Sequence, residues 1–192
     1  MTKILYKYKG LDNFKHFVDI ILKNRLYAAR YEDLNDPMEG QYYYHNGELD
    51  RKIREKIKTM KGELRICSLS RVNNNELMWS HYTNGQRGVV IGVKVNNPRY
   101  TIRSMKYDGI AYVRKQDYSN QTAIDILSHK LEVWSYEEEE RIFQEKEHFI
   151  NVQIVEIVTG RRMSKKDFSL ITELVRIINP SIRIIRAESI LG

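Results

Sequence analysis

Two short stretches of the chain place aromatic rings beside groups that carry charge or move protons. Residues 78–82 read Met-Trp-Ser-His-Tyr and residues 134–141 read Trp-Ser-Tyr-Glu-Glu-Glu-Glu-Arg, and together they contain both tryptophans of the chain. A core aromatic ring needs apolar neighbours and one polar partner, whereas carboxylates are costly to bury unless they are paired. Such a mixture suits a site that handles protons, cations or a ligand. We therefore interpret the two stretches as walls of one candidate site.

The acidic run is the strongest candidate for catalysis. In a strand over residues 133–143, alternation places Glu137, Glu139 and Arg141 on one face. The opposite face then carries Trp134, Tyr136 and Ile142. Neighbouring carboxylates held by a guanidinium can tune each other's pKa, or hold a ribose hydroxyl or a cationic intermediate. The alternative is a solvated helix with a Glu137–Arg141 pair at i, i+4, but the β-forming residues of the stretch favour the strand.

The stretch 78–82 offers a second set of candidate groups. Trp79 can stack on a flat ligand, Tyr82 can contact one, and His81 can transfer a proton near neutral pH. A single histidine is more often a structural residue than a catalyst, so both interpretations stay open for His81.

Two further segments could contact a ligand. Asn35 and Asp36 precede a proline in an expected loop, where they either meet a ligand or cap backbone amides in an Asx-turn. Lys7 and Lys9 share one face of the first expected strand, which suits phosphate contact or, alternatively, protection of a sheet edge. Cys67 lies within another expected strand, and we interpret it as a small buried residue and not a nucleophile.

Several motifs with well-defined chemistry are absent from the sequence. The chain has no glycine-rich dinucleotide fingerprint, P-loop, Cys-x-x-Cys pair, His-Glu-x-x-His helix or nucleophile elbow. The sequence therefore predicts no dedicated metal-binding motif.

The overall composition indicates a single domain, 1–192, with an anionic partner. The chain of 192 residues is 42% hydrophobic and 30% charged, which is enough apolar content for a core. No window approaches the ~20 consecutive apolar residues of a membrane helix, and a single cysteine fits a reducing compartment, so we expect a cytoplasmic protein without a membrane partner. The net charge of +7 favours nucleotide or nucleic acid, although dispersed charge can also serve solubility alone.

Periodicity and turn residues predict the elements that must position these groups. Strands are expected at 4–9, 26–29, 64–70, 88–95, 100–107, 110–113, 133–143, 152–158 and 182–186. Helices are expected between Asp12 and Asn24, at 48–61, 76–82 and 121–131, and from a Ser164 cap to residue 178. Strands outnumber helices and do not alternate with them one to one. The expected fold is therefore α+β, with a mixed, mostly antiparallel sheet and flanking helices.

Five segments occur in a characteristic order along the chain. They are Leu5-Tyr6-Lys7-Tyr8, Asn35-Asp36-Pro37-Met38-Glu39, Cys67-Ser68-Leu69-Ser70, Leu77-Met78-Trp79-Ser80-His81-Tyr82 with Gly88, and Trp134-Ser135-Tyr136-Glu137-x-Glu139-x-Arg141. This order and spacing resemble the bacterial family catalogued as domain of unknown function 2971, over nearly the whole chain. That family label carries no established activity, so it transfers no catalytic residue.

The chain also resembles ADP-ribosyltransferase domains, through a tyrosine-rich first strand that runs into an amphipathic helix, a central aromatic motif and a late Glu-x-Glu strand. The resemblance implies an NAD-using enzyme in which Lys7, where that fold usually has His or Arg, holds the ribose. It implies that Tyr82 lies mid-site and that Glu139 stabilises the departing oxocarbenium, with Glu137 as the accessory carboxylate. The residues that we expect to contact the cofactor are Lys7, Tyr8, Trp79, Trp134, Arg141, Asn35 and Asp36.

Three functions follow as hypotheses. The first is an ADP-ribosyltransferase-like toxin or phage-defence effector that modifies nucleic acid or protein, with an antitoxin or defence-system protein as partner. The second is a metal-dependent nuclease with Asp36, Glu137 and Glu139 as Mg²⁺ ligands. The third is a non-enzymatic module that binds nucleotide or nucleic acid through Trp79 and the basic surface. Under both enzymatic hypotheses Glu139→Gln should abolish activity with the fold intact, whereas unfolding would indicate a structural ion pair with Arg141.

Overall fold

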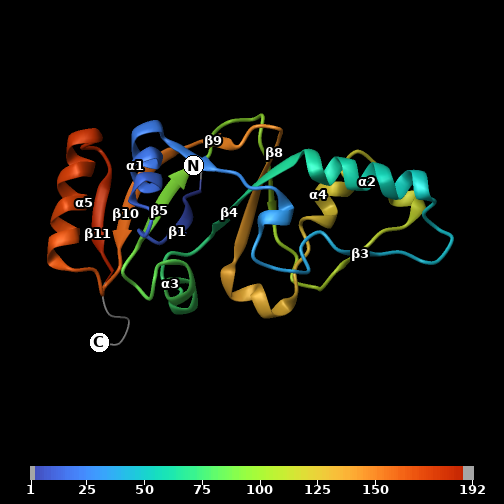
Figure 1. The fold of residues 1–192 in the computed structure, drawn as a ribbon, viewed down its shortest axis with the longest axis horizontal. Helices are drawn as coiled ribbons and strands as arrows, with labels where there is room; N and C mark the ends of the chain where they lie inside the picture. Colours follow the sequence, from blue (N-terminus) through green and yellow to red (C-terminus); the bar gives the residue numbers. More distant parts are fainter. Residues whose placement is uncertain (1–2, 188–192) are drawn as a thin grey trace. The chain divides into compact units, whose positions relative to one another are not determined.

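The computed structural model describes residues 3–187 (Figure 1). Their contacts divide the chain into two units. Of the described residues, unit 1 contains 3–26, 69–97 and 149–187, and unit 2 contains 27–68 and 98–148. Helices and mostly antiparallel strands occur in both units, so the predicted α+β class is confirmed. The prediction of one domain over residues 1–192 stays a prediction. Within residues 3–187, no helix has the length and apolar character needed to cross a bilayer.

Unit 1 is built on a sheet with the strand order β11-β10-β5-β1. Its strands are β1 (Leu5–Lys9), β5 (Val89–Lys94), β10 (Gln153–Thr159) and β11 (Arg183–Arg186). Neighbouring strands are antiparallel except β10 and β11, which are parallel. The end of β4 (Leu64–Ser70) reaches β1, where Ser70 pairs with Tyr6. β5 lies between two neighbours and is buried over Val89–Val93, which explains its continuous apolar run.

Three helices and a short sheet complete unit 1. The helices are α1 (Phe14–Lys23), α3 (Glu76–Tyr82) and α5 (Lys165–Ile178), and α1 contacts α5. α5 begins after Ser164, whose side chain accepts a hydrogen bond from the Asp167 amide. α1 ends at Asn24, which adopts the left-handed conformation that closes many helices. β2 (Arg25–Tyr27) pairs with β9 (Phe149–Asn151).

Unit 2 contains the strand order β4-β8-β6, in which β8 (Glu139–Glu145) is antiparallel to β6 (Thr101–Ser104). A second small sheet pairs β3 (Tyr42–Tyr43) in parallel with β7 (Ala111–Tyr112). Helix α2 (Arg51–Glu63) contacts α4 (Thr122–Ile126). Three short 3₁₀ helices are η1 (Tyr31–Asp33), η2 (Lys115–Asp117) and η3 (Glu132–Glu137).

The expected strand over 133–143 is wrong in its first half. Residues Glu132–Glu137 form η3, and Glu138 adopts a left-handed conformation with φ of 43° before β8 begins at Glu139. The β-forming side chains of this stretch predict extended backbone. However, the Trp134 amide donates to the Leu131 carbonyl at 3.0 Å, which closes a helical turn instead. Strand alternation therefore does not relate Glu137 to Glu139.

The helix expected at 121–131 is also wrong in its length. α4 ends at Ile126, because the following backbone pairs with the segment near Lys106: the Lys106 amide donates to the Ser128 carbonyl, and the Lys130 amide to the Lys106 carbonyl, both at 2.9 Å. At α1, Asn13 and not Asp12 occupies the N-cap position. The short strands β3 and β9 and the 3₁₀ helices are not among the predicted elements. The other predicted strands and helices agree with the structure in kind, with ends that shift by a few residues.

Candidate functional site

The predicted site residues fall in two units. Unit 1 holds Lys7, Tyr8, Trp79, His81 and Tyr82, whereas unit 2 holds Asn35, Asp36, Trp134, Glu137, Glu139 and Arg141. A single site walled by both tryptophans stays a prediction.

In unit 2, five charged side chains form a buried group that we name the Arg141 cluster: Glu39, Lys130, Glu137, Glu139 and Arg141. Arg141 is 1% exposed and is the largest of the fully buried side chains among the described residues. Its Nε donates to Oε1 of Glu139 at 2.8 Å, and its Nη2 donates to Oε2 of Glu39 at 2.8 Å. Its Nη1 donates to the Leu127 carbonyl at 2.7 Å. The guanidinium is thus held by two carboxylates and one backbone oxygen.

Lys130 closes the cluster as the second cation. Its Nζ donates to Oε2 of Glu137 at 2.5 Å and to Oε2 of Glu139 at 3.2 Å. The same Nζ lies 4.9 Å from the centroid of the half-buried Trp134 ring, a favourable cation–π distance. Two cations therefore face three carboxylates, and Trp134 lies at the edge of this group.

The pKa values in the cluster reflect burial and pairing together. Burial raises the pKa of Glu139, but the charges of Arg141 and Lys130 outweigh it and lower the pKa to about 2. Burial also raises the pKa of Glu39, and the net shift stays upward despite Arg141. For Lys130, burial lowers the pKa, yet the nearby carboxylates of Glu139 and Glu137 produce a net rise. Glu139 and Lys130 are therefore held in their charged forms at neutral pH.

A turn before β3 delivers Glu39 to Arg141. Oδ1 of Asp36 accepts a hydrogen bond from the Met38 amide at 2.9 Å, and the Glu39 amide donates to the Asp36 carbonyl at 3.0 Å. The Asx-turn interpretation is thereby confirmed for Asp36, while Asn35 is exposed. The turn at residues 36–39 therefore has a structural role, because it positions Glu39 in the Arg141 cluster.

The contacts of Glu139 suit a structural role. Arg141 and Lys130 engage both of its carboxylate oxygens, and the residue is only 3% exposed. A carboxylate that acts on a substrate must come within hydrogen-bonding reach of it, whereas this one faces two protein cations. The predicted catalytic roles of Glu139 and Glu137 gain no support from this geometry and stay predictions.

The predicted Mg²⁺ ligands are likewise occupied by protein groups. Asp36 accepts a backbone hydrogen bond, and Glu137 and Glu139 pair with Lys130. Across residues 3–187, no group of three or more His, Cys, Asp or Glu side chains is arranged to hold a metal ion.

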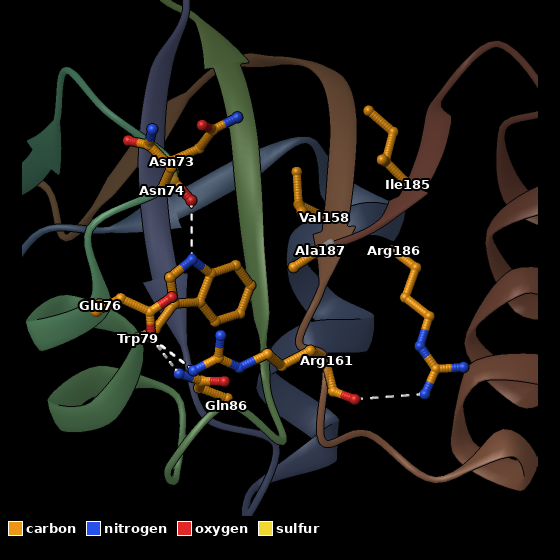
Figure 2. A pocket seen from close by; sticks show the side chains of 10 residues that line it. All are labelled: Asn73, Asn74, Glu76, Trp79, Gln86, Val158, Arg161, Ile185, Arg186 and Ala187. Atoms are coloured by element: carbon orange, nitrogen blue, oxygen red, sulfur yellow. Dashed lines mark hydrogen bonds and ion pairs between the residues drawn. The ribbon is translucent and has the colours of Figure 1, made fainter. Parts of the chain in front are cut away.

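Unit 1 contains a pocket of about 210 Å³, which we name the Trp79 pocket (Figure 2). It is lined by Asn73, Asn74, Glu76, Trp79, Gln86, Val158, Arg161, Ile185, Arg186 and Ala187. Val158 of β10 and Ile185 of β11 are cross-strand neighbours, so the sheet supplies an apolar side. Figure 2 shows Gln86 and the Arg161 guanidinium below the Trp79 ring and Glu76 to its left, so these three residues make this side of the pocket polar.

Trp79 is fixed as a wall of this pocket. Asn75 caps α3 by accepting a hydrogen bond from the Met78 amide at 3.1 Å. The indole Nε1 donates to the Asn73 carbonyl at 2.8 Å, and the Tyr8 ring packs edge-on with ring centroids 5.6 Å apart. Trp79 is 3% exposed, so its ring is mostly covered by protein. The structure thus brings together two of the predicted residues, Tyr8 and Trp79.

Gln86 brings an unsatisfied hydrogen-bond acceptor to the pocket. Its Nε2 donates to Oε2 of Glu76 at 2.5 Å, and because a carboxylate only accepts, the amide nitrogen must face Glu76. The amide oxygen Oε1 is then turned away, and within the described part of the chain it is buried without a hydrogen-bond partner. Gln86 itself is 8% exposed. An unmet buried polar atom costs roughly 1–3 kcal/mol, which a ligand with a hydrogen-bond donor would recover.

The loop that carries Gln86 has an uncommon backbone. Asn84, Gly85 and Gln86 follow one another with φ values of 55°, 61° and 70°. Left-handed non-glycine residues cost roughly 1–3 kcal/mol and cluster at functional sites. The loop is anchored by the Arg162 amide, which donates to the Gln86 carbonyl at 3.1 Å. A Cβ at Gly160 would collide with that same carbonyl, so glycine is required there.

Two arginines place positive charge at the pocket. Nη2 of Arg161 donates to Oε2 of Glu76 at 2.9 Å, the oxygen that Gln86 also contacts. Nη2 of Arg186 donates to the Met163 carbonyl at 2.9 Å, and its guanidinium lies 5.6 Å from the Phe168 ring centroid. Neither contact of Arg186 is with a carboxylate, so its charge can act on an anionic ligand.

Three other predicted residues are not among those that line the Trp79 pocket. His81 is exposed and lies two residues after Trp79, so it points to a different side of α3. Its ring packs edge-on against Tyr82 with centroids 6.3 Å apart. Lys7 precedes Tyr8 on β1, so it faces the opposite side of the sheet from the ring that contacts Trp79.

Sequence reasoning missed the residues that define both sites. These are Gln86, Arg161 and Arg186 at the pocket, and Glu39 and Lys130 in the cluster. One local signal existed, since Asn84-Gly85 marks a tight turn directly before Gln86. No protein-family model, curated protein or solved structure matches the chain. Both family resemblances therefore stay predictions.

Proposed function

We propose that unit 1 is a nucleotide-binding module, in which the Trp79 pocket receives one base and the arginines beside it meet the phosphate. The observation that carries the proposal is the buried, unpartnered Oε1 of Gln86 at the pocket. Because Glu76 fixes the amide orientation, this group can only accept a hydrogen bond from a ligand. A ligand that contacts Oε1 must therefore present an N–H or O–H donor.

Charge and size narrow the ligand class further. Arg161 and Arg186 favour an anionic group, and the net charge of +7 favours anionic partners in general. The pocket volume of about 210 Å³ lies below the roughly 300–1,000 Å³ of complete small-molecule sites. A nucleotide meets these three requirements. Its base fits the pocket volume and supplies a hydrogen-bond donor, and its phosphate supplies the negative charge.

NAD is a nucleotide ligand of this kind and is the cofactor that the transferase resemblance implies. The proposal concerns binding only, since the contacts of Glu139 supply no support for an oxocarbenium-stabilising role. The toxin or phage-defence role and the antitoxin partner rest on the resemblance alone.

Isothermal titration calorimetry with matched nucleotides tests the proposal. AMP carries an amino group on its base, the 5′-monophosphate of unsubstituted purine riboside carries no donor there, and inorganic phosphate has no base. We expect AMP to bind most tightly, by about tenfold over the purine analogue, as one hydrogen bond of about 1.4 kcal/mol implies. Gln86→Met should remove that preference, because methionine keeps the length of the side chain and loses the acceptor.

Arg176→Gln serves as the charge control, because Arg176 is an exposed residue of α5 that does not line the pocket. Its AMP affinity should match the wild type. Equal binding of AMP and the purine analogue by the wild type, or no AMP binding, would contradict the proposal. NAD can be titrated in parallel. If NAD binds the wild type and Gln86→Met weakens this binding, the predicted cofactor would use the Trp79 pocket.

A further inference from the structure

The small sheet of unit 2 presents a pair of tyrosine rings to solvent. β3 and β7 run in parallel with Tyr43 opposite Tyr112, and with Tyr42 opposite Ala111. Ala111 is buried and Tyr42 packs on the core, so alternation turns the other pair outward. Tyr43 is 63% exposed and Tyr112 is 45% exposed. Two neighbouring outward aromatic rings on a rigid backbone form a platform.

Contacts at the edges hold this platform in place. The hydroxyl of Tyr112 donates to Oε2 of Glu48 at 3.2 Å, and the His45 ring packs edge-on against Tyr112 with centroids 5.3 Å apart. A ring that is already positioned loses little side-chain entropy on binding.

A basic helix shares the core beneath the platform. Ile53 and Ile57 of α2 belong to the same apolar cluster as Tyr42 and Ala111, so α2 and the small sheet cover one core. The outer side of α2 carries five exposed cations: Arg51, Lys52, Arg54, Lys56 and Lys58. Its acidic residues are only Glu55 and Glu63. The guanidinium of Arg54 also lies 5.7 Å from the Tyr44 ring centroid, which ties one flank of α2 to the segment that follows β3. Arg51 and Lys58 share this flank, because they lie three residues before and four residues after Arg54 on the helix.

We propose that this surface, which we name the Tyr43 face (Tyr43, His45, Tyr112 and the cations Arg51, Arg54 and Lys58 of α2), binds single-stranded nucleic acid. Open aromatic rings stack on bases of any sequence, and neighbouring cations track the phosphates. In a duplex the base faces are stacked and hidden, so a duplex could bind this surface only through its phosphates and the cations. The Tyr43 face shares no residue with the Trp79 pocket, so the inference goes beyond the nucleotide-binding proposal and does not depend on it.

Fluorescence anisotropy with a labelled oligothymidine of about 12 nucleotides tests the inference, because this length covers a typical single-strand site. Tyr43→Ala should weaken binding about 5- to 150-fold, as expected for a stacking contact. Tyr43→Phe should bind like the wild type, since stacking needs the ring and not the hydroxyl. Arg51→Gln with Lys58→Gln should reduce the salt slope of log affinity by about 1.4, for two lost phosphate contacts.

Tyr27→Ala is the matched control, since Tyr27 is also an exposed tyrosine, 53% accessible, but lies in β2. It should leave the oligonucleotide affinity unchanged. The inference is overturned if Tyr43→Ala binds like the wild type, if the wild type does not bind, or if a duplex or polyglutamate competes as well as unlabelled single strand. AMP titration of Tyr43→Ala separates the two proposals, because the Trp79 pocket remains intact in this variant.

Discussion

At the scale of single residues, buried polar side chains have two different roles in this protein. Glu139 and Arg141 are buried and satisfied by each other and by Lys130. Gln86 is also buried, but its Oε1 has no protein partner within the described residues. A satisfied buried charge network stabilises or specifies the fold, whereas an unsatisfied buried acceptor indicates a place for a ligand. This contrast is why we assign the ligand to Gln86 and not to Glu139.

Glu139→Gln should therefore destabilise the fold, contrary to the sequence-based expectation that it would only abolish activity. Removing one partner of a buried ion pair leaves the other charges uncompensated and typically costs about 3–5 kcal/mol. The neighbouring Glu140 is less buried, and its side chain accepts a hydrogen bond from Ser104 at the surface. Glu140→Gln should cost well under about 1 kcal/mol. Urea denaturation of both variants checks this, and equal stabilities would refute a structural role for Glu139.

The stabilisation from Glu139 should also depend on pH in a defined direction. Its folded-state pKa of about 2 lies below the ordinary value of 4.5, because Arg141 and Lys130 outweigh the effect of burial. A depressed carboxyl pKa adds stability above the unfolded-state pKa, and this is lost as pH falls toward the folded-state pKa. The difference in unfolding free energy between wild type and Glu139→Gln should therefore narrow from pH 5 toward pH 2, by on the order of 3 kcal/mol.

Glu39 acts on the pH dependence of stability with the opposite sign. Its pKa is raised by burial, so the stability it adds is present at low pH and is lost as pH rises. Burial is the largest cause of this rise and is present in both proteins, whereas the smaller part that comes from the charge of Glu139 is lost in Glu139→Gln. A difference that stays constant from pH 7 to pH 3 would contradict the assigned ion pairs.

At the scale of elements, the predictions succeeded where one local pattern decides the structure. The strand over 64–70 and the helix over 76–82 appear with the expected bounds, because a buried apolar run and a capped helical turn are visible in the sequence. The strand over 133–143 failed because Glu138 adopts a left-handed backbone that no side-chain pattern announces. Glu39 was missed as a partner of Arg141 because 102 residues separate them. Long-range pairings of this kind depend on the whole fold.

The loop that presents Gln86 gives a test at this scale. A Cβ at Gly160 would overlap the Gln86 carbonyl, so Gly160→Ala must displace one of two hydrogen-bonded backbones. We expect a loss of about 1–3 kcal/mol in unfolding free energy, as for overpacking, together with weaker AMP binding. Gly62→Ala is the matched control, because nothing lies within 4 Å of a Cβ there and Gly62 is in helix α2. It should be neutral or stabilise by up to about 1 kcal/mol.

Thermal denaturation and AMP titration of the two glycine variants distinguish the outcomes. If Gly160→Ala retains both its stability and its AMP affinity, the loop tolerates displacement. Gly160 would then have no role in positioning Gln86. If Gly62→Ala lost as much unfolding free energy and AMP affinity as Gly160→Ala, the effect would not be specific to the Gln86 loop.

At the scale of the whole molecule, the chain passes repeatedly between its two units. Unit 1 is assembled from three separate segments and unit 2 from two. Composition and the scarcity of linker-like sequence predict one domain, because neither can reveal which distant segments contact one another. The α+β class was predictable from the order of elements, but the distribution of candidate residues between the units was not. Each unit consequently has its own candidate surface, the Trp79 pocket in unit 1 and the Tyr43 face in unit 2.

The two surfaces should act independently in binding. They share no residue, and substitutions without shared partners usually combine additively, within about 0.5 kcal/mol. A double-mutant cycle with Gln86→Met and Tyr43→Ala measures this, with AMP affinity and oligothymidine affinity as separate readouts. Each substitution should affect only its own ligand, and the double variant should show the sum of the single effects. A coupling above about 1 kcal/mol in either readout would contradict the independence of the two surfaces.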